Sequence, residues 1–133
     1  MEILNKNAAL LSNSEVYALL KQTKENLAHK LLKKKSLKNP ENVNLEINVD
    51  KHLSTIVYES LRYLEKTPCV NQSPYIVTEF LRKCEDPKNN LKLTKIEKLQ
   101  LLNHRPSTSV ELQYLIEDSE ERFTLEQMDE LLE

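Results

Sequence analysis

Apolar residues recur at the spacing of α-helices along most of the chain. A first stripe falls within about 120° of a helical wheel and consists of Val16, Leu19, Leu20, Thr23, Leu27 and Leu31. A second stripe consists of Leu53, Ile56, Val57, Leu61 and Leu64, and Thr67–Pro68 follows it as a stop signal. These two patterns predict two amphipathic helices, the first of them long.

Helix-start signals divide the rest of the chain into short helices. Ser73 is followed by Pro74 at a first helical position, and Asp86–Pro87 closes that helix. Capping boxes, in which Ser or Thr is followed three residues later by Glu or Gln, stand at Ser12…Glu15, Thr94…Glu97, Thr108…Glu111 and Thr124…Gln127. Short helices of about 9–12 residues in quick succession predict a compact all-α domain rather than a long bundle or coiled coil.

One stretch breaks the helical pattern. Between residues 36 and 50, Val43, Leu45, Ile47 and Val49 alternate with polar residues, which is the periodicity of a strand. No second strand is apparent nearby to pair with it, so we predict a linker that is mobile or lies extended on a partner. Upstream, "NAALL" at residues 7–11 is short and apolar and favours a small strand or an extended arm.

These patterns predict an all-α fold in three parts. Residues 1–35 form a short N-terminal extended arm and a long amphipathic helix, residues 36–50 form the linker, and residues 51–133 form the compact helical domain. The chain of 133 residues is long enough to bury a core without disulfides or metals. Cys69 and Cys84 lack CxxC spacing, and we interpret them as free or buried thiols in a reducing compartment.

Composition excludes several classes of site. The chain has no glycine, which excludes the P-loop and the dinucleotide fingerprint, because both need a backbone approach that a Cβ atom blocks. The net charge is −2, but residues 21–38 hold seven Lys against Glu25, and residues 117–133 hold eight acids against Arg122. These clusters suit different partner surfaces or are solvated helix faces. The Tyr residues are not spaced as in an RNA-binding platform, so no sequence-specific nucleic-acid binding is expected. The chain contains neither a signal pattern nor a membrane-length apolar run.

The segment "LLNHRPSTSVEL" at residues 101–112 is the strongest candidate for chemistry. His104 and Arg105 suit a proton shuttle and an anion clamp, but no nucleophile motif accompanies them, and His29 and His52 give no metal spacing. The structural interpretation is favoured: a helix corner in which Pro106 stops one helix and a cap starts the next. The residues of this structural turn are Asn103, Pro106, Thr108 and Glu111. We therefore expect no catalytic, cofactor-binding or metal site.

Three blocks in order resemble the family of small stalk subunits of RNA polymerase III, also named the calcitonin-gene-related-peptide receptor component family in animals. The blocks are "ALLSNSEVYALL", "TPCVNQSPYIVTEFL" and "KLTKIEKLQLLNHRPSTSVELQYLIEDSEERFTLEQMDELL". The small stalk subunits of polymerase II and of archaeal polymerase are similar more loosely. The resemblance implies an HRDC-like domain from about residue 51, no enzymatic activity and a nuclear location. "VNLEINV" in the linker is not a feature of that family.

The resemblance also implies partners. These are a larger stalk subunit with an OB-like domain, as an obligate heterodimer, the polymerase III core, and the TFIIB-related initiation factor. Carried over to this sequence, the partner-binding residues are Ala8, Ala9, Leu10, Leu11, Val16, Leu19, Leu20, Leu27 and Leu31. The alternative function, suggested by the animal name, is a cytoplasmic adaptor of a G-protein-coupled receptor, for which the sequence offers no lipidation motif or membrane anchor.

Overall fold

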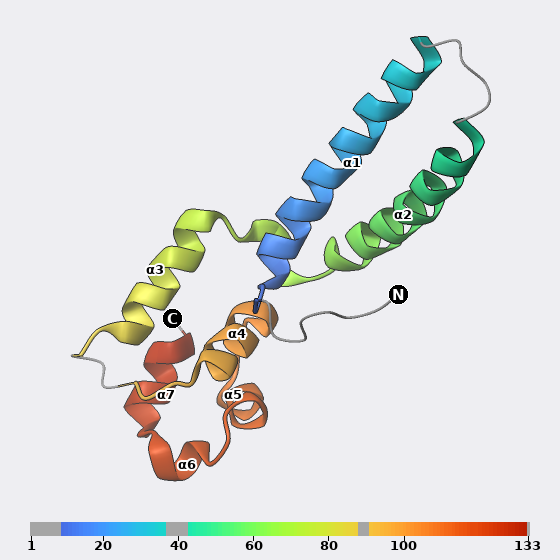
Figure 1. The fold of residues 1–133 in the computed structure, drawn as a ribbon. Helices are drawn as coiled ribbons and strands as arrows, with labels where there is room; N and C mark the ends of the chain where they lie inside the picture. Colours follow the sequence, from blue (N-terminus) through green and yellow to red (C-terminus); the bar gives the residue numbers. More distant parts are fainter. Residues whose placement is uncertain (1–8, 37–42, 88–90, 133) are drawn as a thin grey trace. The chain divides into compact units, whose positions relative to one another are not determined.

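The computed structural model describes residues 9–36, 43–87 and 91–132, and within these ranges the chain is helical without β-strands, which confirms the all-α class. The elements are α1 (Asn13–Ser36), α2 (Val43–Leu64), the 3-10 helix η1 (Pro68–Asn71), α3 (Pro74–Glu85), α4 (Lys95–His104), α5 (Ser109–Leu115), α6 (Ser119–Arg122) and α7 (Leu125–Leu132) (Figure 1). None of the helices in the described ranges is long and apolar enough to cross a membrane.

The chain divides into two compact units, Met1–Val70 and Asn71–Glu133. The sequence predicted a boundary near residue 50, with the second amphipathic helix in the C-terminal domain. In the structure α2 contacts α1 and belongs to the N-terminal unit. The boundary therefore falls after α2 instead of before it, because α2 finds its packing partner in the preceding helix.

The N-terminal unit is a pair of helices that run side by side in opposite directions (Figure 1). The predicted capping box starts α1: the hydroxyl of Ser12 accepts from the backbone N–H of Glu15 at 3.3 Å, and the Glu15 carboxylate accepts from the N–H of Ser12 at 2.7 Å. The hydrogen bonds from Ser12 hold the pKa of Glu15 below its usual range. Ala9 to Ser12, before α1, are neither helix nor strand.

The predicted linker over residues 36–50 is wrong where the structure describes it. Ser36 is the last residue of α1, and residues 43–50 are the first turns of α2. The alternation of Val43, Leu45, Ile47 and Val49 that suggested a strand also puts apolar residues four apart, which is the spacing of a helix face. Short apolar runs do not separate the two periodicities. Residues 37–42 lie outside the described residues.

The core of the C-terminal unit is built around α5, which contacts α4, α6 and α7. Leu112 of α5 is 0% exposed, and the buried residues packed with it are Leu101, Ile116, Phe123 and Met128. Leu101, Leu112 and Met128 come from α4, α5 and α7, and Ile116 and Phe123 directly follow α5 and α6. Several short helices thus share one core that none of them could bury alone.

The helix starts in this unit follow the predicted signals. The hydroxyl of Ser73 accepts from the N–H of Ile76 at the start of α3, and Pro74 is the first helical residue. Both halves of the capping box are present at Thr94, and both are present at Thr124. The one-turn helix α6 was not predicted, because four residues are too few to show a period.

Candidate protein-interaction surfaces

The N-terminal unit exposes large apolar side chains on α1 and just before it. Leu10 is 67% exposed, Leu11 46% and Leu19 52%, and Ala9 is also exposed. Val16 and Leu20 are half-buried on α1. Side chains of this kind that stay open to solvent in the isolated chain suit burial against another protein.

The other predicted partner-binding residues are placed differently. Leu27 is 7% exposed, so this chain already covers it, and it lines a small hollow with Leu53 of α2. Ala8 and the side chain of Leu31 lie outside the described residues. The part of the expected surface that stays accessible to a partner therefore consists of the residues just before α1 and the first two turns of α1.

A second apolar stripe lies on α2, where no partner-binding surface was predicted. The buried face of α2 holds Val57, Leu61 and Leu64, whereas Ile56 is 60% exposed and Tyr63 is 68% exposed. Seven residues separate Ile56 from Tyr63, which is about two helical turns, so both side chains lie on one side of the helix. A helix with a buried face and an adjacent exposed apolar stripe has a further surface to cover.

The corner formed by residues 101–112 separates α4 from α5. His104 is the last residue of α4, and the hydroxyl of Thr108 accepts from the N–H of Glu111 at 3.3 Å. The Glu111 carboxylate accepts from the backbone N–H of Ser107 at 2.6 Å and from the Ser107 hydroxyl at 3.2 Å. These bonds hold the pKa of Glu111 below its usual range. The corner is held by local hydrogen bonds one residue earlier than the capping-box pattern implies.

Arg105 ends α4 in the left-handed region, with φ at 48°. Its backbone N–H donates to the carbonyl of Leu101 at 2.8 Å, which satisfies a terminal carbonyl of the helix. Glycine or asparagine usually takes this position because a Cβ atom is disfavoured there. Its guanidinium is exposed and has no side-chain or carbonyl partner among the described residues.

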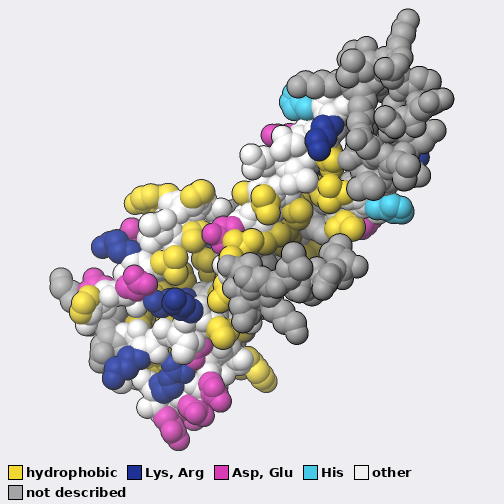
Figure 2. All heavy atoms as spheres, viewed as in Figure 1, with side chains coloured by type: hydrophobic (Ala, Val, Ile, Leu, Met, Phe, Trp, Pro, Cys, Tyr) yellow, Lys and Arg dark blue, Asp and Glu magenta, His cyan; other side chains and the backbone are white. Residues whose placement is uncertain are grey.

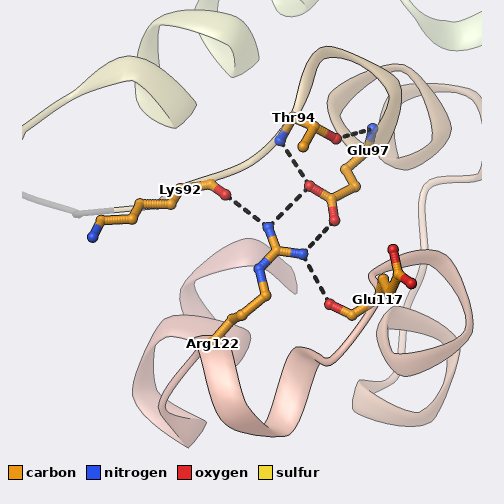
Figure 3. A network of polar contacts seen from close by, with 5 residues as sticks. All are labelled: Lys92, Thr94, Glu97, Glu117 and Arg122. Carbon is orange, nitrogen blue, oxygen red and sulfur yellow. Dashed lines mark hydrogen bonds and ion pairs between the residues drawn. The ribbon is translucent and has the colours of Figure 1, made fainter.

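A partly buried ion pair ties the start of α4 to α6 (Figure 3). The guanidinium of Arg122 donates to both carboxylate oxygens of Glu97, at 2.5 and 3.1 Å, and to the carbonyls of Glu117 and Lys92, each at 2.8 Å. One Glu97 oxygen also accepts from the N–H of Thr94 at 2.7 Å. The Arg122 hydrogen bonds lower the pKa of Glu97 to about 2, against the opposing effect of burial. This arrangement is structural, because every oxygen and nitrogen it uses already has a protein partner.

Groups capable of acid–base, redox or metal chemistry are scattered. His29, His52 and His104 are exposed on α1, α2 and α4. Cys69 and Cys84 are both buried and free, and burial raises the pKa of the Cys84 thiol. Within the ranges that the structure describes, no three His, Cys, Asp or Glu side chains gather as a metal ion would require. Figure 2 shows apolar side chains open at the surface among charged ones on one face of the molecule.

Two comparisons with known proteins identify relatives of this chain. The sequence model of the family described as RNA polymerase Rpb4 matches residues 10–133. The fission yeast protein named DNA-directed RNA polymerase III subunit rpc9 (Schizosaccharomyces pombe) is 31% identical over 133 residues, which cover 100% of this chain and 95% of the yeast protein. Neither similarity concerns a peptide receptor, so the receptor hypothesis gains no support. Because the match runs through both units, from the segment before α1 to the end of α7, the chain belongs to the RNA polymerase Rpb4 family.

Proposed function

We propose that this protein is a non-catalytic stalk subunit of RNA polymerase III that acts in the nucleus through protein–protein contacts. The similarity to the fission yeast polymerase III subunit, over nearly the full length of both proteins, carries this proposal. The scattered histidines and thiols and the exposed apolar side chains agree with a role in binding. We retain the HRDC-like character of the C-terminal helices as an expectation from the family resemblance.

The partner that we propose is the larger stalk subunit, in a heterodimer. The surface for it comprises Leu10, Leu11 and Leu19, extended by Ile56 and Tyr63 of α2. These side chains are exposed in the isolated chain and belong to one compact unit. Their burial would add about 25 cal/mol per Å² of apolar area removed from water, which is how stable subunit interfaces gain most of their free energy.

Through the stalk, we propose that the protein joins the polymerase III core and supports initiation by contact with the TFIIB-related factor. These two contacts rest on the family resemblance. The first experiment is an affinity purification of the tagged full chain from a nuclear extract, followed by mass spectrometry. Recovery of the polymerase III subunits supports the proposal, whereas tight plasma-membrane association without polymerase subunits would favour the receptor hypothesis.

The heterodimer is tested by co-expression of the full chain with the larger stalk subunit. We expect a stable one-to-one complex, which Leu19→Asp disrupts, because the substitution puts an unpaired charge into an apolar interface. Leu20→Asp is expected to act in the same direction. Leu32→Asp is the matched control, since Leu32 is 66% exposed on the same helix but lies about 140° around it from Leu19. If Leu19→Asp copurifies normally with the larger stalk subunit, the placement of the interface is wrong. If the unmodified chain stays a monomer in the presence of that subunit, the proposed heterodimer is wrong.

A further inference from the structure

An open groove of about 530 Å³ lies in the C-terminal unit. Its described lining comes from α3, from the corner between α4 and α5, and from the end of α7. Most of this lining is apolar and includes Ile76, Phe80, Leu102 and Leu131. Ile76 is 50% exposed, so the apolar surface continues from the floor of the groove to its rim. The surface is shared by three helices of one unit and is therefore formed by the fold of that unit alone.

One polar atom in this groove has no partner. The side-chain amide of Gln72 donates through Nε2 to the carbonyl of Leu102 at 2.6 Å, which fixes the orientation of the amide. Its other atom, Oε1, is buried and makes no hydrogen bond. A buried acceptor without a donor is unfavourable, and proteins usually satisfy it. Oε1 is closed to solvent, so the amide of Gln72 braces the carbonyl of Leu102 in the wall of the groove and does not bind a ligand.

Arg105 provides a second unused group at the groove. It lines the groove in the left-handed conformation described above, and no side chain or carbonyl among the described residues pairs with its guanidinium. The backbone geometry favours glycine at this position, whereas the charge of an arginine suits the C-terminal end of a helix. A guanidinium binds a carboxylate through two parallel hydrogen bonds.

The charges around the groove favour one orientation of a ligand that carries a carboxylate. Glu79 on α3 is already paired with Arg82 at 2.6 Å, whereas Glu130 lines the groove from α7. A carboxylate on the ligand is thus favoured at the α4–α5 corner and disfavoured beside α7. A peptide segment carries both large apolar side chains and a carboxylate, so it matches the apolar lining and Arg105 together.

We propose that this groove binds a short acidic and apolar segment of another protein. Large apolar side chains of the segment fill the space between Ile76, Phe80 and Leu131, and a carboxylate pairs with Arg105. The apolar anchors supply most of the affinity, and the contact with Arg105 sets the position and direction of the segment. This inference does not depend on the polymerase assignment, because peptide binding is measured on the full chain alone.

The probe is a random dodecapeptide library displayed on phage and panned against the full-length protein. Selected peptides are synthesised with a fluorophore and titrated by fluorescence polarisation. We expect them to contain at least two large apolar residues and an Asp or Glu, and to bind on the order of tenfold or more weakly to Ile76→Asp and to Arg105→Glu. Val110→Asp is the matched control, since Val110 is 58% exposed in the same unit and is not among the described lining residues of the groove.

A second comparison identifies the role of Arg105. Arg105→Gly removes the guanidinium but suits the left-handed backbone, so it should weaken peptide binding without loss of folding, as judged by circular dichroism. The proposal would be overturned if the selected peptides are basic or bind Ile76→Asp as tightly as the unmodified protein. It would also be overturned if panning against the unmodified protein enriches no peptides beyond those enriched by panning against Ile76→Asp. A concentration-dependent dimer in sedimentation that Ile76→Asp abolishes would also overturn it, because a second copy of the chain would then occupy the groove.

Discussion

The guanidinium of Arg122 holds both carboxylate oxygens of Glu97 across 25 residues of sequence. The pair joins the first turn of α4 to the single turn of α6, and the backbone carbonyls of Lys92 and Glu117 complete the coordination of the guanidinium. Side-chain exposure is 10% for Glu97 and 30% for Arg122, so water screens this pair less than a surface pair. The pair is a polar connection between two short helices of the C-terminal unit that are far apart in the sequence.

Removal of the arginine should therefore destabilise the protein strongly. Arg122→Ala leaves the Glu97 carboxylate in a largely buried place without its cation, and we expect the free energy of unfolding to fall by about 2–4 kcal/mol. Arg122→Lys should recover only part of this, because an ammonium does not bind both oxygens as a planar fork does. Urea unfolding followed by circular dichroism measures both. Arg82→Ala, which breaks the exposed pair with Glu79, is the control and should lower the free energy of unfolding much less than Arg122→Ala does.

The same pair predicts a dependence of stability on pH. The pKa of Glu97 is about 2 in the folded protein and 4.5 in its ordinary state, so the folded state binds the proton more weakly. The stabilisation is complete above about pH 5 and is lost as the pH falls towards about 2, and it amounts to on the order of 3 kcal/mol. Urea unfolding at several acidic pH values should show this loss in the unmodified chain and a smaller one in Glu97→Gln. Glu126→Gln, at an exposed position in α7, should keep the unmodified pH dependence. Equal slopes for all three proteins would contradict the role given to Glu97.

The left-handed residue at the end of α4 gives a prediction of opposite sign. Arg105→Gly should raise the free energy of unfolding by about 0.5–1 kcal/mol, because glycine adopts a positive φ without the penalty of a Cβ atom. Arg105→Ala is the matched control: it removes the same guanidinium but keeps Cβ, and should give no such gain. Thermal unfolding of the three proteins compares them. If Gly and Ala behave alike, backbone strain at this position is not significant.

The exposed stripe on α2 predicts a contribution to the proposed heterodimer. Ile56→Asp should weaken binding of the larger stalk subunit on the order of tenfold or more, since a charge would enter an apolar contact. Tyr114→Asp is the control, because Tyr114 is 87% exposed on α5 in the other unit. Isothermal titration calorimetry with the purified larger subunit measures both. Unchanged binding of Ile56→Asp would confine the interface to α1 and the residues before it.

Local signals in the sequence predicted most of the helix starts. A capping box spans four residues and depends on hydrogen bonds between neighbours, so Ser12, Thr94 and Thr124 were recognisable without knowledge of the fold. Pro74, which follows Ser73, and Pro106 were likewise recognisable as local signals for a helix start and a helix stop. The apolar spacing of α1 and of the second half of α2 predicted those helices for the same reason.

Features that depend on contacts across the fold were missed. The pairing of Glu97 with Arg122 requires α6, which is too short to have an apolar period, and Arg122 stood out only as the single cation among eight acids. The start of α2 was missed because its alternating apolar residues fit a strand as well as a helix. The unpaired Oε1 of Gln72 depends on a carbonyl 30 residues away. No pattern in one sequence reveals such pairs, because they are made by tertiary packing.

The partnership of Arg122 also determines the electrostatic field outside α6 and α7. Its positive charge is neutralised by Glu97, whereas the other charged residues of this segment are exposed and carry one sign: Glu117, Asp118, Glu120, Glu121, Glu126, Asp129 and Glu130. A nucleic-acid backbone carries regular negative charge and is repelled by such a surface. In an assembly that handles a DNA template and an RNA transcript, this end of the C-terminal unit would face protein or solvent and leave the path of both strands clear.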